Sequence, residues 1–156
     1  MNKNFSAQDA FKVLTNYFND NGIPYEEDNN ILSSNGYLGD IVIQFKIFID
    51  EETKCINFLS PIPITVEEDK KVIMSVAVNY LNASILEGRF KYVIQEGMIF
   101  FEHSNVFLNS NIANETIEKI LKTSLNMLNI HIDKINKFNK GIIDLNKFVE
   151  LIIKGE

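Results

Sequence analysis

The chain has 156 residues, of which 46% are hydrophobic and 23% are charged, as in ordinary globular proteins. We therefore expect a single domain over residues 1–156 with one full hydrophobic core. The formal net charge of −6 argues against nucleic acids and anionic membranes as partners, because phosphate groups are bound by clustered Lys and Arg side chains.

The cysteine content and the hydropathy pattern indicate a cytoplasmic protein. Cys55 is the only cysteine, so an internal disulfide cannot form, and its place beside an apolar run predicts a buried thiol. The N-terminal residues lack the apolar stretch of a signal peptide. No segment approaches the roughly 18 apolar residues of a membrane-spanning helix. We expect no contact with a membrane.

The first predicted element is a helix over residues 6–20. Ser6 and Asp9 have the spacing of a capping box, with Asp in place of the usual Glu. Gly22 is expected to end this helix in the left-handed conformation. Three large apolar residues share one face of the helix and are expected in the core: Phe11, Leu14 and Phe18.

Three strands are predicted next. A polar turn over residues 26–30 leads into a short strand, and Asn35-Gly36 is a typical hairpin turn. Residues 41–49 alternate between apolar and polar side chains, which predicts a half-buried strand. A returning strand follows, and Pro61 and Pro63 are expected to stop its pairing because proline has no N–H to donate.

A second helix and a hairpin follow. Thr65 is the expected N-cap of a helix over residues 66–82, whose core-facing stripe would be Ile73, Val76, Ala77, Tyr80 and Leu81. Two strands, over residues 90–94 and 98–103, are expected to pair as an antiparallel hairpin around a turn at Gly97.

The C-terminal region is helical. A long helix is predicted to begin near Asn111 or Asn114 and to end at Gly141, and Asp144 is the expected N-cap of a short helix at about 144–153. The element order is then α-β-β-β-α-β-β-α-α. Strands that follow one another as hairpins predict an α+β fold, an antiparallel sheet with helices packed on it.

This order of elements resembles the YbjN-like family, described as bacterial sensory-transduction regulators. The matching features cover about residues 5–140 and are the strand at 40–50, the Pro61/Pro63 segment, the helix ending in Asn79–Asn82, Gly88-x-Phe90, the Gly97 hairpin and the long helix. The short helix after Gly141 and the poor match of residues 1–35 are departures from the family. The resemblance implies the type III secretion chaperone-like fold and a small acidic cytoplasmic protein, often a homodimer, that binds other polypeptides.

No set of residues predicts a catalytic, cofactor or metal site. His103 and His131 lack matched ligands at suitable positions, so we interpret them as surface or boundary residues. The acidic runs lie in turns or at a helix N-terminus, where acidic residues are expected in any case. The Gly-x-Ser-x-Gly motif and the Gly-rich phosphate loops are absent. We expect a protein that is not an enzyme and needs no cofactor.

Apolar residues beyond the predicted core stripes are the remaining functional signal. They lie on the second helix and on the long helix, and the candidate interface consists of Val72, Met74, Val78, Met127 and Ile130. Such residues are either scattered exposed side chains, which every protein has, or a surface for self-association or client binding.

Two functional hypotheses follow from the sequence. The first is a non-enzymatic protein-binding module, a homodimer that acts as a chaperone or regulatory adaptor and captures a protein client by hydrophobic contacts. The alternative is a small-ligand-binding sensory domain with an apolar, Phe-lined cavity between the sheet and the long helix.

Overall fold

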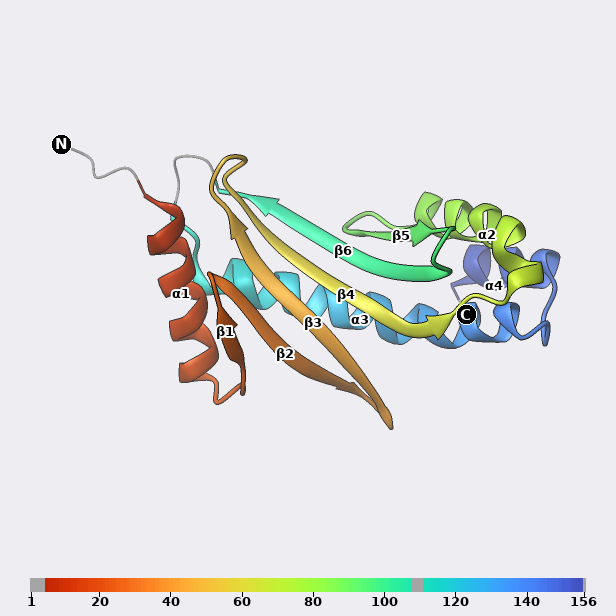
Figure 1. Cartoon of the computed structure of the whole chain (residues 1–156), viewed down its shortest axis with the longest axis horizontal. Coiled ribbons are helices and arrows are strands. Elements are labelled where there is room, and N and C mark those ends of the chain that lie inside the picture. Colours follow the sequence, from red (N-terminus) through yellow and green to blue (C-terminus); the bar gives the residue numbers. More distant parts are fainter. Residues whose placement is uncertain (1–4, 108–110, 156) are drawn as a thin grey trace.

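The computed structural model describes residues 5–107 and 111–155, and its elements form the predicted α+β arrangement (Figure 1). The helical elements in these residues are α1 (Ala7–Asp20), the 3₁₀ turn η1 (Glu68–Lys70), α2 (Lys71–Ala83), α3 (Asn114–Asn139) and α4 (Leu145–Lys154). The strands are β1 (Glu26–Asp28), β2 (Ile31–Leu38), β3 (Ile41–Asp50), β4 (Cys55–Thr65), β5 (Arg89–Val93) and β6 (Met98–Val106). All neighbouring strands pair antiparallel, in the order β1-β2-β3-β4-β6-β5.

The sheet contains one strand more than the sequence predicted. Residues 26–28, expected in a polar turn, form the short edge strand β1, and only Asn29 and Asn30 make the turn to β2. Their φ angles of 48° and 63° are those of a type I′ turn, which asparagine tolerates better than most residues. The acidic side chains of β1 are exposed, so hydrophobic alternation could not reveal this strand.

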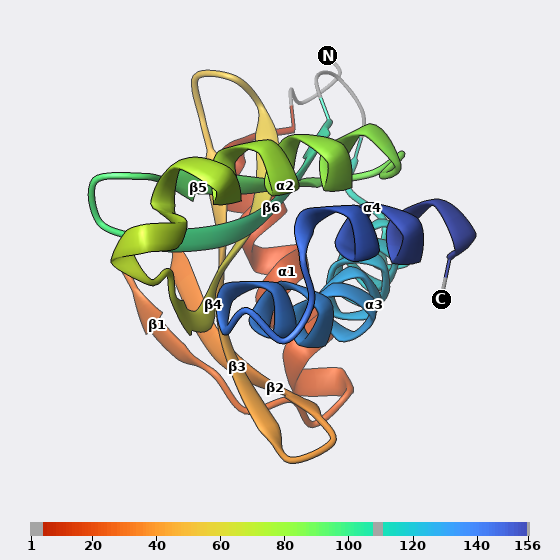
Figure 2. The ribbon, with the colours of Figure 1, turned by 90° about the vertical axis from the view of Figure 1, so that its right-hand side faces the viewer.

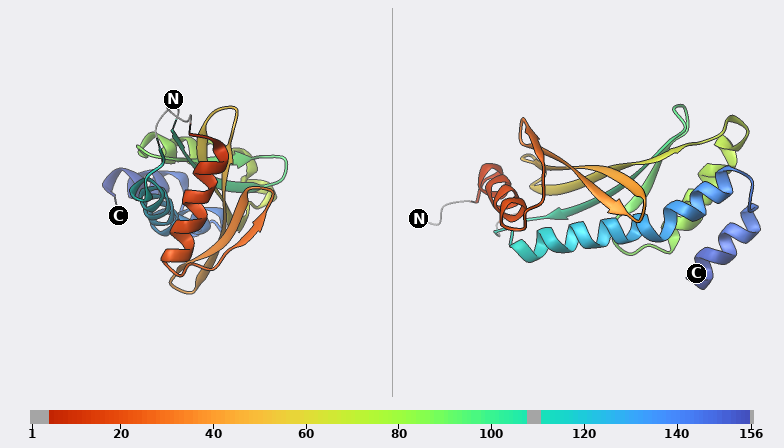
Figure 3. Two further views of the ribbon diagram at one scale, coloured as in Figure 1. Left: turned by 90° about the vertical axis from the view of Figure 1, so that its left-hand side faces the viewer. Right: turned by 90° about the horizontal axis from the view of Figure 1, so that it is seen from below.

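Helices α1 and α3 cover one face of the sheet, and α3 runs along β2, β4 and β6 (Figure 3). Ile43, Phe45 and Ile47 of β3 point to this face and are buried, as their alternation predicted. Gly36 lies inside β2 and not in the predicted turn. Glycine fits this position because a Cβ would lie 2.7 Å from Leu125 Cδ2 on α3. The hairpin turn is instead at Gly39-Asp40, with Gly39 at a φ of 61°.

The predicted helix ends of α1 and α4 are confirmed. The Asp9 N–H donates to the Ser6 hydroxyl at 3.1 Å, and the Ser6 N–H donates to the Asp9 carboxylate at 3.0 Å, which completes the capping box. The carboxylate of Asp144 accepts the Lys147 N–H at 2.8 Å at the start of α4. Apolar residues that recur at helical spacing along α3, from Ile117 to Ile135, form a buried stripe.

The sheet splits between β3 and β4, and two prolines explain the split. Pairing of β3 with β4 runs from Asp50 to Lys46 and ends at the pair Lys46–Leu59. Alternate residues of a strand direct their backbone groups to the same neighbour, so Pro61 and Pro63 follow Leu59 on the β3 side. Neither can donate there, and the β2–β3 hairpin diverges from the end of β4 (Figure 1).

Pairing of β4 with β6 continues past the split. Ser60 pairs with Phe101, and a register shift follows between Pro61 and Thr65. The buried Ser60 hydroxyl also donates to the Gln44 carbonyl at 2.8 Å, so one side chain bridges the base of the split. The prolines therefore stop the pairing with one neighbouring strand only, which is less than the sequence predicted.

The second helix differs from its prediction in its start and in its buried face. Thr65 is the last residue of β4 and not an N-cap, and α2 begins only at Lys71, after η1. α2 contacts β5 on one side and α4 on another (Figure 2). Two of its sides are therefore covered. Its buried residues are Met74, Ala77, Val78 and Leu81, of which Ala77 and Leu81 belong to the predicted stripe.

Two asparagine side chains fasten α2 and its flanks to the rest of the fold. The Asn82 amide donates to the Phe90 carbonyl and accepts the Phe90 N–H, both at 2.8 Å, and so occupies the outer edge of β5. The buried Asn139 amide accepts the Glu67 N–H and donates to the Thr65 carbonyl, both at 2.9 Å. Each side chain satisfies backbone groups that the sheet leaves unpaired.

Replacement of Asn82 by alanine is expected to lower the free energy of unfolding by about 2 kcal/mol, because two part-buried backbone groups of Phe90 lose their partners. Urea denaturation measures this loss. Asn79→Ala is the matched control, since Asn79 is exposed on the same helix, and we expect a change below about 0.5 kcal/mol. Equal losses in the two variants would contradict the role given to Asn82.

Candidate functional site

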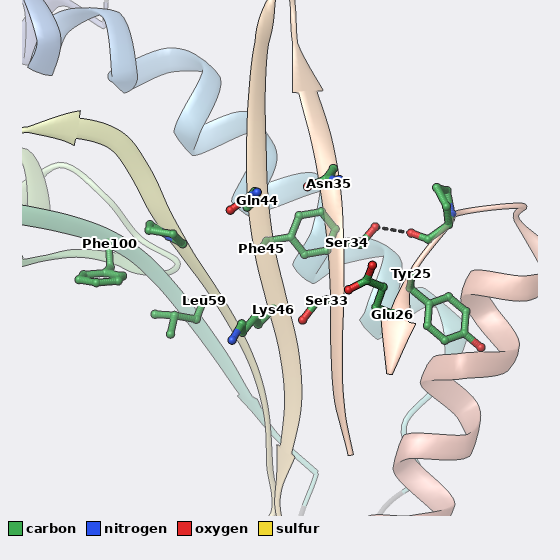
Figure 4. Close-up of a pocket in the computed structure, with 12 residues that line it drawn as sticks. Tyr25, Glu26, Ser33, Ser34, Asn35, Gln44, Phe45, Lys46, Leu59 and Phe100 are labelled. Carbon is green, nitrogen blue, oxygen red and sulfur yellow. Dashed lines mark hydrogen bonds between the residues drawn. The ribbon is translucent and has the colours of Figure 1, made fainter. Parts of the chain in front are cut away.

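A hollow of about 710 Å³ lies where β3 and β4 part (Figure 4). In the view of Figure 4, α3 runs behind the strands, so the hollow opens on the sheet face that α3 leaves uncovered. Residues of β1, β2, β3, β4 and β6 surround it, together with the segment before β1: Pro24, Tyr25, Glu26, Ser33, Ser34, Asn35, Gln44, Phe45, Lys46, Leu59, Pro61 and Phe100.

The hollow combines an apolar floor with a polar rim. Leu59, Pro61 and Phe100 remain half-buried, and Phe100 pairs with Pro61 across β4 and β6. Lys46 and Gln44 are exposed on β3 beside this floor. Half-exposed apolar side chains with polar groups beside them can desolvate an apolar segment and orient its backbone. The arrangement suits the binding of an apolar segment.

The structure separates the five residues of the predicted interface. Met74 and Val78 are buried in the core, so the prediction that they form an open surface is wrong for these two residues. Their burial follows from the packing of α2 against both β5 and α4. Val72 is 76% exposed, Ile130 is 38% exposed, and Met127 is half-buried against the core.

An apolar stripe remains exposed on α2 after this packing. Val72, Val76 and Tyr80 are all exposed and recur every four residues, which places them on one side of the helix. Ile73, Val76 and Tyr80 belonged to the predicted core stripe, and of these only Ile73 packs against the core. The helix therefore presents to solvent part of the face that the sequence assigned to the interior.

The two histidines are buried, whereas the sequence predicted surface or boundary positions for them. His103 Nδ1 lies 3.3 Å from the Ser124 hydroxyl, and burial lowers the pKa of His103 while Glu87 opposes this shift. Ser124 is fully buried on α3, so a substrate has no access to its hydroxyl. Among residues 5–107 and 111–155, no group of three or more His, Cys, Asp or Glu could hold a metal ion.

The Cys55 thiol is more exposed than the sequence predicted. Cys55 is half-buried at the start of β4, and not fully buried as predicted.

Aromatic rings pack on the sheet face that α1 and α3 cover, with Phe45 stacked on Phe58 at 5.1 Å between ring centroids. The ring of Phe101 lies 6.4 Å from that of Phe58. The large hollow is thus not the predicted cavity between the sheet and α3.

Comparison with known proteins identifies the family. The family model described as "YbjN: Putative bacterial sensory transduction regulator" matches residues 11–137. The chain belongs to the YbjN family. The match ends before α4, in agreement with the departure predicted after Gly141. It includes residues 11–35, so the poor match predicted for the N-terminal region is wrong for these residues. None of the curated proteins is significantly similar to this sequence.

Solved structures share the fold at low sequence identity. The crystal structure of YbjN, a putative transcription regulator from E. coli, is similar with 16% identity and a TM-score of 0.64, over 84% of this chain and 92% of that chain. A chain of the ExsC–ExsE complex is similar with 11% identity and a TM-score of 0.51, over 86% and 93%. These likenesses establish the type III secretion chaperone-like fold.

An archaeal protein has the same architecture. An uncharacterised protein from Methanothermobacter thermautotrophicus is similar with 9% identity and a TM-score of 0.54, over 86% of this chain and 99% of that chain.

None of the helices in the described part of the chain is both long and apolar enough to span a membrane.

The residues that carried the YbjN resemblance have structural roles. The helix end at Asn82 and the Gly88-x-Phe90 motif meet, because the Asn82 amide bonds the Phe90 backbone. Gly97 accepts the Val66 N–H at 2.9 Å, and a Cβ on Gly97 would lie 3.1 Å from the Val66 carbonyl oxygen. Asn82, Gly88, Phe90 and Gly97 therefore hold the fold together, whereas Pro61 and the strand at 40–50, which also carried the resemblance, contribute residues to the hollow.

Sequence reasoning missed the residues of the hollow, although two signals pointed to them. Pro61 and Pro63 stand two residues apart, which places both missing donors on one side of a strand. Leu59 shares that spacing, and Phe100 lies in the opposite strand of the sheet. Two missing N–H donors on the same side of a strand interrupt its hydrogen bonds to the neighbouring strand. An apolar side chain beside this interruption then forms the floor of the gap between the strands.

Proposed function

We propose that this protein binds a segment of another polypeptide in the hollow between β3 and β4, as a chaperone or regulatory adaptor. The observation that carries the proposal is the half-exposed floor of Leu59, Pro61 and Phe100 in a hollow of about 710 Å³ on the uncovered sheet face. The YbjN family description and the similarity to a chain of the ExsC–ExsE complex support a binding role over catalysis. A cytoplasmic location remains a prediction of the sequence.

The mechanism is desolvation of apolar side chains of the client against this floor. Burial contributes roughly 25 cal/mol per Å² of apolar surface removed from water, and the polar rim at Lys46 and Gln44 restricts which segments fit. A small metabolite in the same hollow is the alternative, since its size falls within the range of ligand sites. A protein client is favoured because the hollow is open across five strands.

The double variant Leu59→Ser/Phe100→Ser tests the proposal. We expect it to capture the partner bound by tagged wild-type protein at least about tenfold less well, while its urea denaturation curve remains cooperative. Lys46→Glu alters the exposed rim without touching the core, and should reduce capture as well. Ile153→Asp is the matched control, because Ile153 is 79% exposed on α4, away from the hollow.

Two results would contradict this assignment. Undiminished capture by the folded double variant would exclude the hollow as the client site. Loss of capture by Ile153→Asp alone would move the site to α4. A stabilising effect of apolar metabolites that the double variant abolishes, without any protein partner, would favour the sensory alternative.

We also propose that the chain forms a homodimer through the exposed stripe of Val72, Val76 and Tyr80 on α2. Three apolar side chains in a row on one helix are suited to pair with the same row of a second copy. Sedimentation equilibrium of wild type and Val76→Asp tests this proposal. A monomer in wild type, or a dimer in both proteins, would contradict the proposed interface.

A further inference from the structure

The two edges of the sheet are treated differently. At β5, the Asn82 amide bonds both backbone groups of Phe90, and α2 packs beside this strand. At the other end, β1 pairs only with Ile31 to Ser33, whereas β2 continues to Leu38. Beyond Ser33, none of the strands in the described residues pairs with the outer side of β2. Figure 1 shows the β2–β3 hairpin projecting away from β1.

The free edge presents backbone hydrogen-bonding groups. Leu38 and Ile41 flank a two-residue turn and form a hydrogen-bonded pair. Every second residue of β2 before Leu38 therefore also directs its N–H and C=O groups toward β3. Asn35 and Tyr37 lie between them, and their N–H and C=O groups therefore point outward. Pro24, two residues before β1, lies beside Asn35 on the outer side of β2 and has no N–H group to donate.

The side chains at this edge are accessible and partly apolar. Tyr37 is 74% exposed and pairs across the hairpin with Val42, which is 50% exposed. Asn35 is exposed and also lines the hollow. Native sheets usually protect an edge with a lysine, a proline, a bulge or a covering element. The Pro24 carbonyl accepts the Ser34 hydroxyl at 2.6 Å, so Pro24 lies beside Asn35, whereas none of the strands in the described residues pairs with the outer side of Tyr37.

The charges beside the edge are acidic. Glu26, Glu27 and Asp28 are exposed on β1 at one end of the free edge, and Asp40 is exposed in the turn at the other. None of these four carboxylates forms an ion pair with another described residue. Lys46 is the cation of the adjoining hollow. An incoming strand with Lys or Arg at its ends complements this edge.

We propose that the segment from Asn35 to Tyr37 binds an extended, basic polypeptide segment as an added β-strand. The added strand would pair with the outward N–H and C=O groups, place apolar side chains against Tyr37, and set its cations near Glu26 and Asp40. This inference rests on the proposed function, since the same client would enter the adjoining hollow. It specifies the client as basic and extended at this edge.

A fluorescent peptide with the sequence Thr-Lys-Val-Lys-Val-Lys-Thr, titrated into the full chain, tests the inference. Tyr37→Pro removes the outward N–H and keeps the pairing with β3, and an edge position tolerates proline. We expect this variant to bind the peptide at least about tenfold more weakly than wild type. Tyr37→Ser keeps the backbone donor and is the matched control, with a loss of about threefold or less.

Two peptide controls do not depend on how the variants fold. A peptide with Glu in place of Lys, and a peptide N-methylated at alternate residues, should both bind at least about tenfold more weakly. Equal binding of the acidic peptide, or equal effects of Tyr37→Pro and Tyr37→Ser, would overturn the inference. Pairing of the edge with a second copy, detected as a dimer that Tyr37→Pro dissociates and the peptide does not, would also overturn it.

The capture experiment separates this inference from the proposed function. If Leu59→Ser/Phe100→Ser loses the natural partner and Tyr37→Pro keeps it, the hollow binds the client and the edge does not. If Tyr37→Pro loses the partner and the double variant keeps it, the edge inference stands and the hollow assignment is wrong.

Discussion

Replacement of Gly88 by alanine is expected to lower the free energy of unfolding by about 3 kcal/mol. Gly88 has a φ of 78°, in the left-handed region, and a Cβ there would lie 2.4 Å from Phe101 Cζ and 3.0 Å from the Glu102 carbonyl oxygen. Phe101 is fully buried between Phe58 and Phe90, so its ring has little room to move. Urea denaturation with constant m-values measures the loss.

Gly22→Ala is the matched control for this prediction. Gly22 also has a left-handed φ, of 63°, but nothing lies within 4 Å of its added Cβ. We expect a loss of about 1 kcal/mol from the backbone conformation alone. The difference of about 2 kcal/mol between the two variants then measures the contact with Phe101. Equal losses would show that close packing does not require glycine at position 88.

Acid is expected to destabilise the protein through His131. Burial, and to a lesser extent the charge of Lys134, lowers the pKa of His131 from 6.5 to about 4. The folded state therefore holds the neutral imidazole, whereas the unfolded state takes up a proton below pH 6.5. The contribution of His131 to stability is complete above pH 6.5 and is lost as the pH falls from 6.5 to 4, which amounts to about 2 kcal/mol at pH 5.

Urea denaturation of wild type and His131→Leu at pH 7.5 and pH 5 measures this term. The variant should lose about 2 kcal/mol less than wild type between the two pH values. His131 Nδ1 is buried and has no hydrogen-bond partner among the described residues, so leucine removes a desolvated polar atom and should not reduce stability at pH 7.5. Asp50, Glu87, Glu150 and His103 also have lowered pKa values, but they are present in both proteins, so their contributions cancel in the difference. A parallel acid response of the two proteins would contradict the prediction.

Local patterns predicted the elements whose surroundings are simple. The alternation of β3 and the stripe of α3 each face one buried layer, so hydrophobic period and burial coincide. The capping box at Ser6 and Asp9 depends only on neighbours within one turn, and it formed as expected. The order of these elements was sufficient to recognise the YbjN family and its fold.

Features that depend on distant partners could not be predicted from local patterns. α2 is covered by both β5 and α4, so its apolar residues did not define one face, and Met74 and Val78 were misplaced on the surface. Gly36 looked like a turn residue because Leu125, which occupies the space above it, is 89 positions away in the sequence.

The hollow depends on distant partners in the same way. The missing donors of Pro61 and Pro63 are visible in the sequence, but their consequence appears only once β3 is known to lie on that side of β4. The pairing of Phe100 with Pro61 then completes the floor of the hollow.

Photo-crosslinking from the hollow tests the central claim most directly. Benzoyl-phenylalanine placed at Phe100 keeps an aromatic ring on the floor of the hollow, and the same residue placed at Ile153 serves as the control on α4. We predict that irradiation in native cells joins the Phe100 variant to a discrete polypeptide partner and leaves the Ile153 variant unmodified. Crosslinks from Ile153 with none from Phe100 would contradict the account.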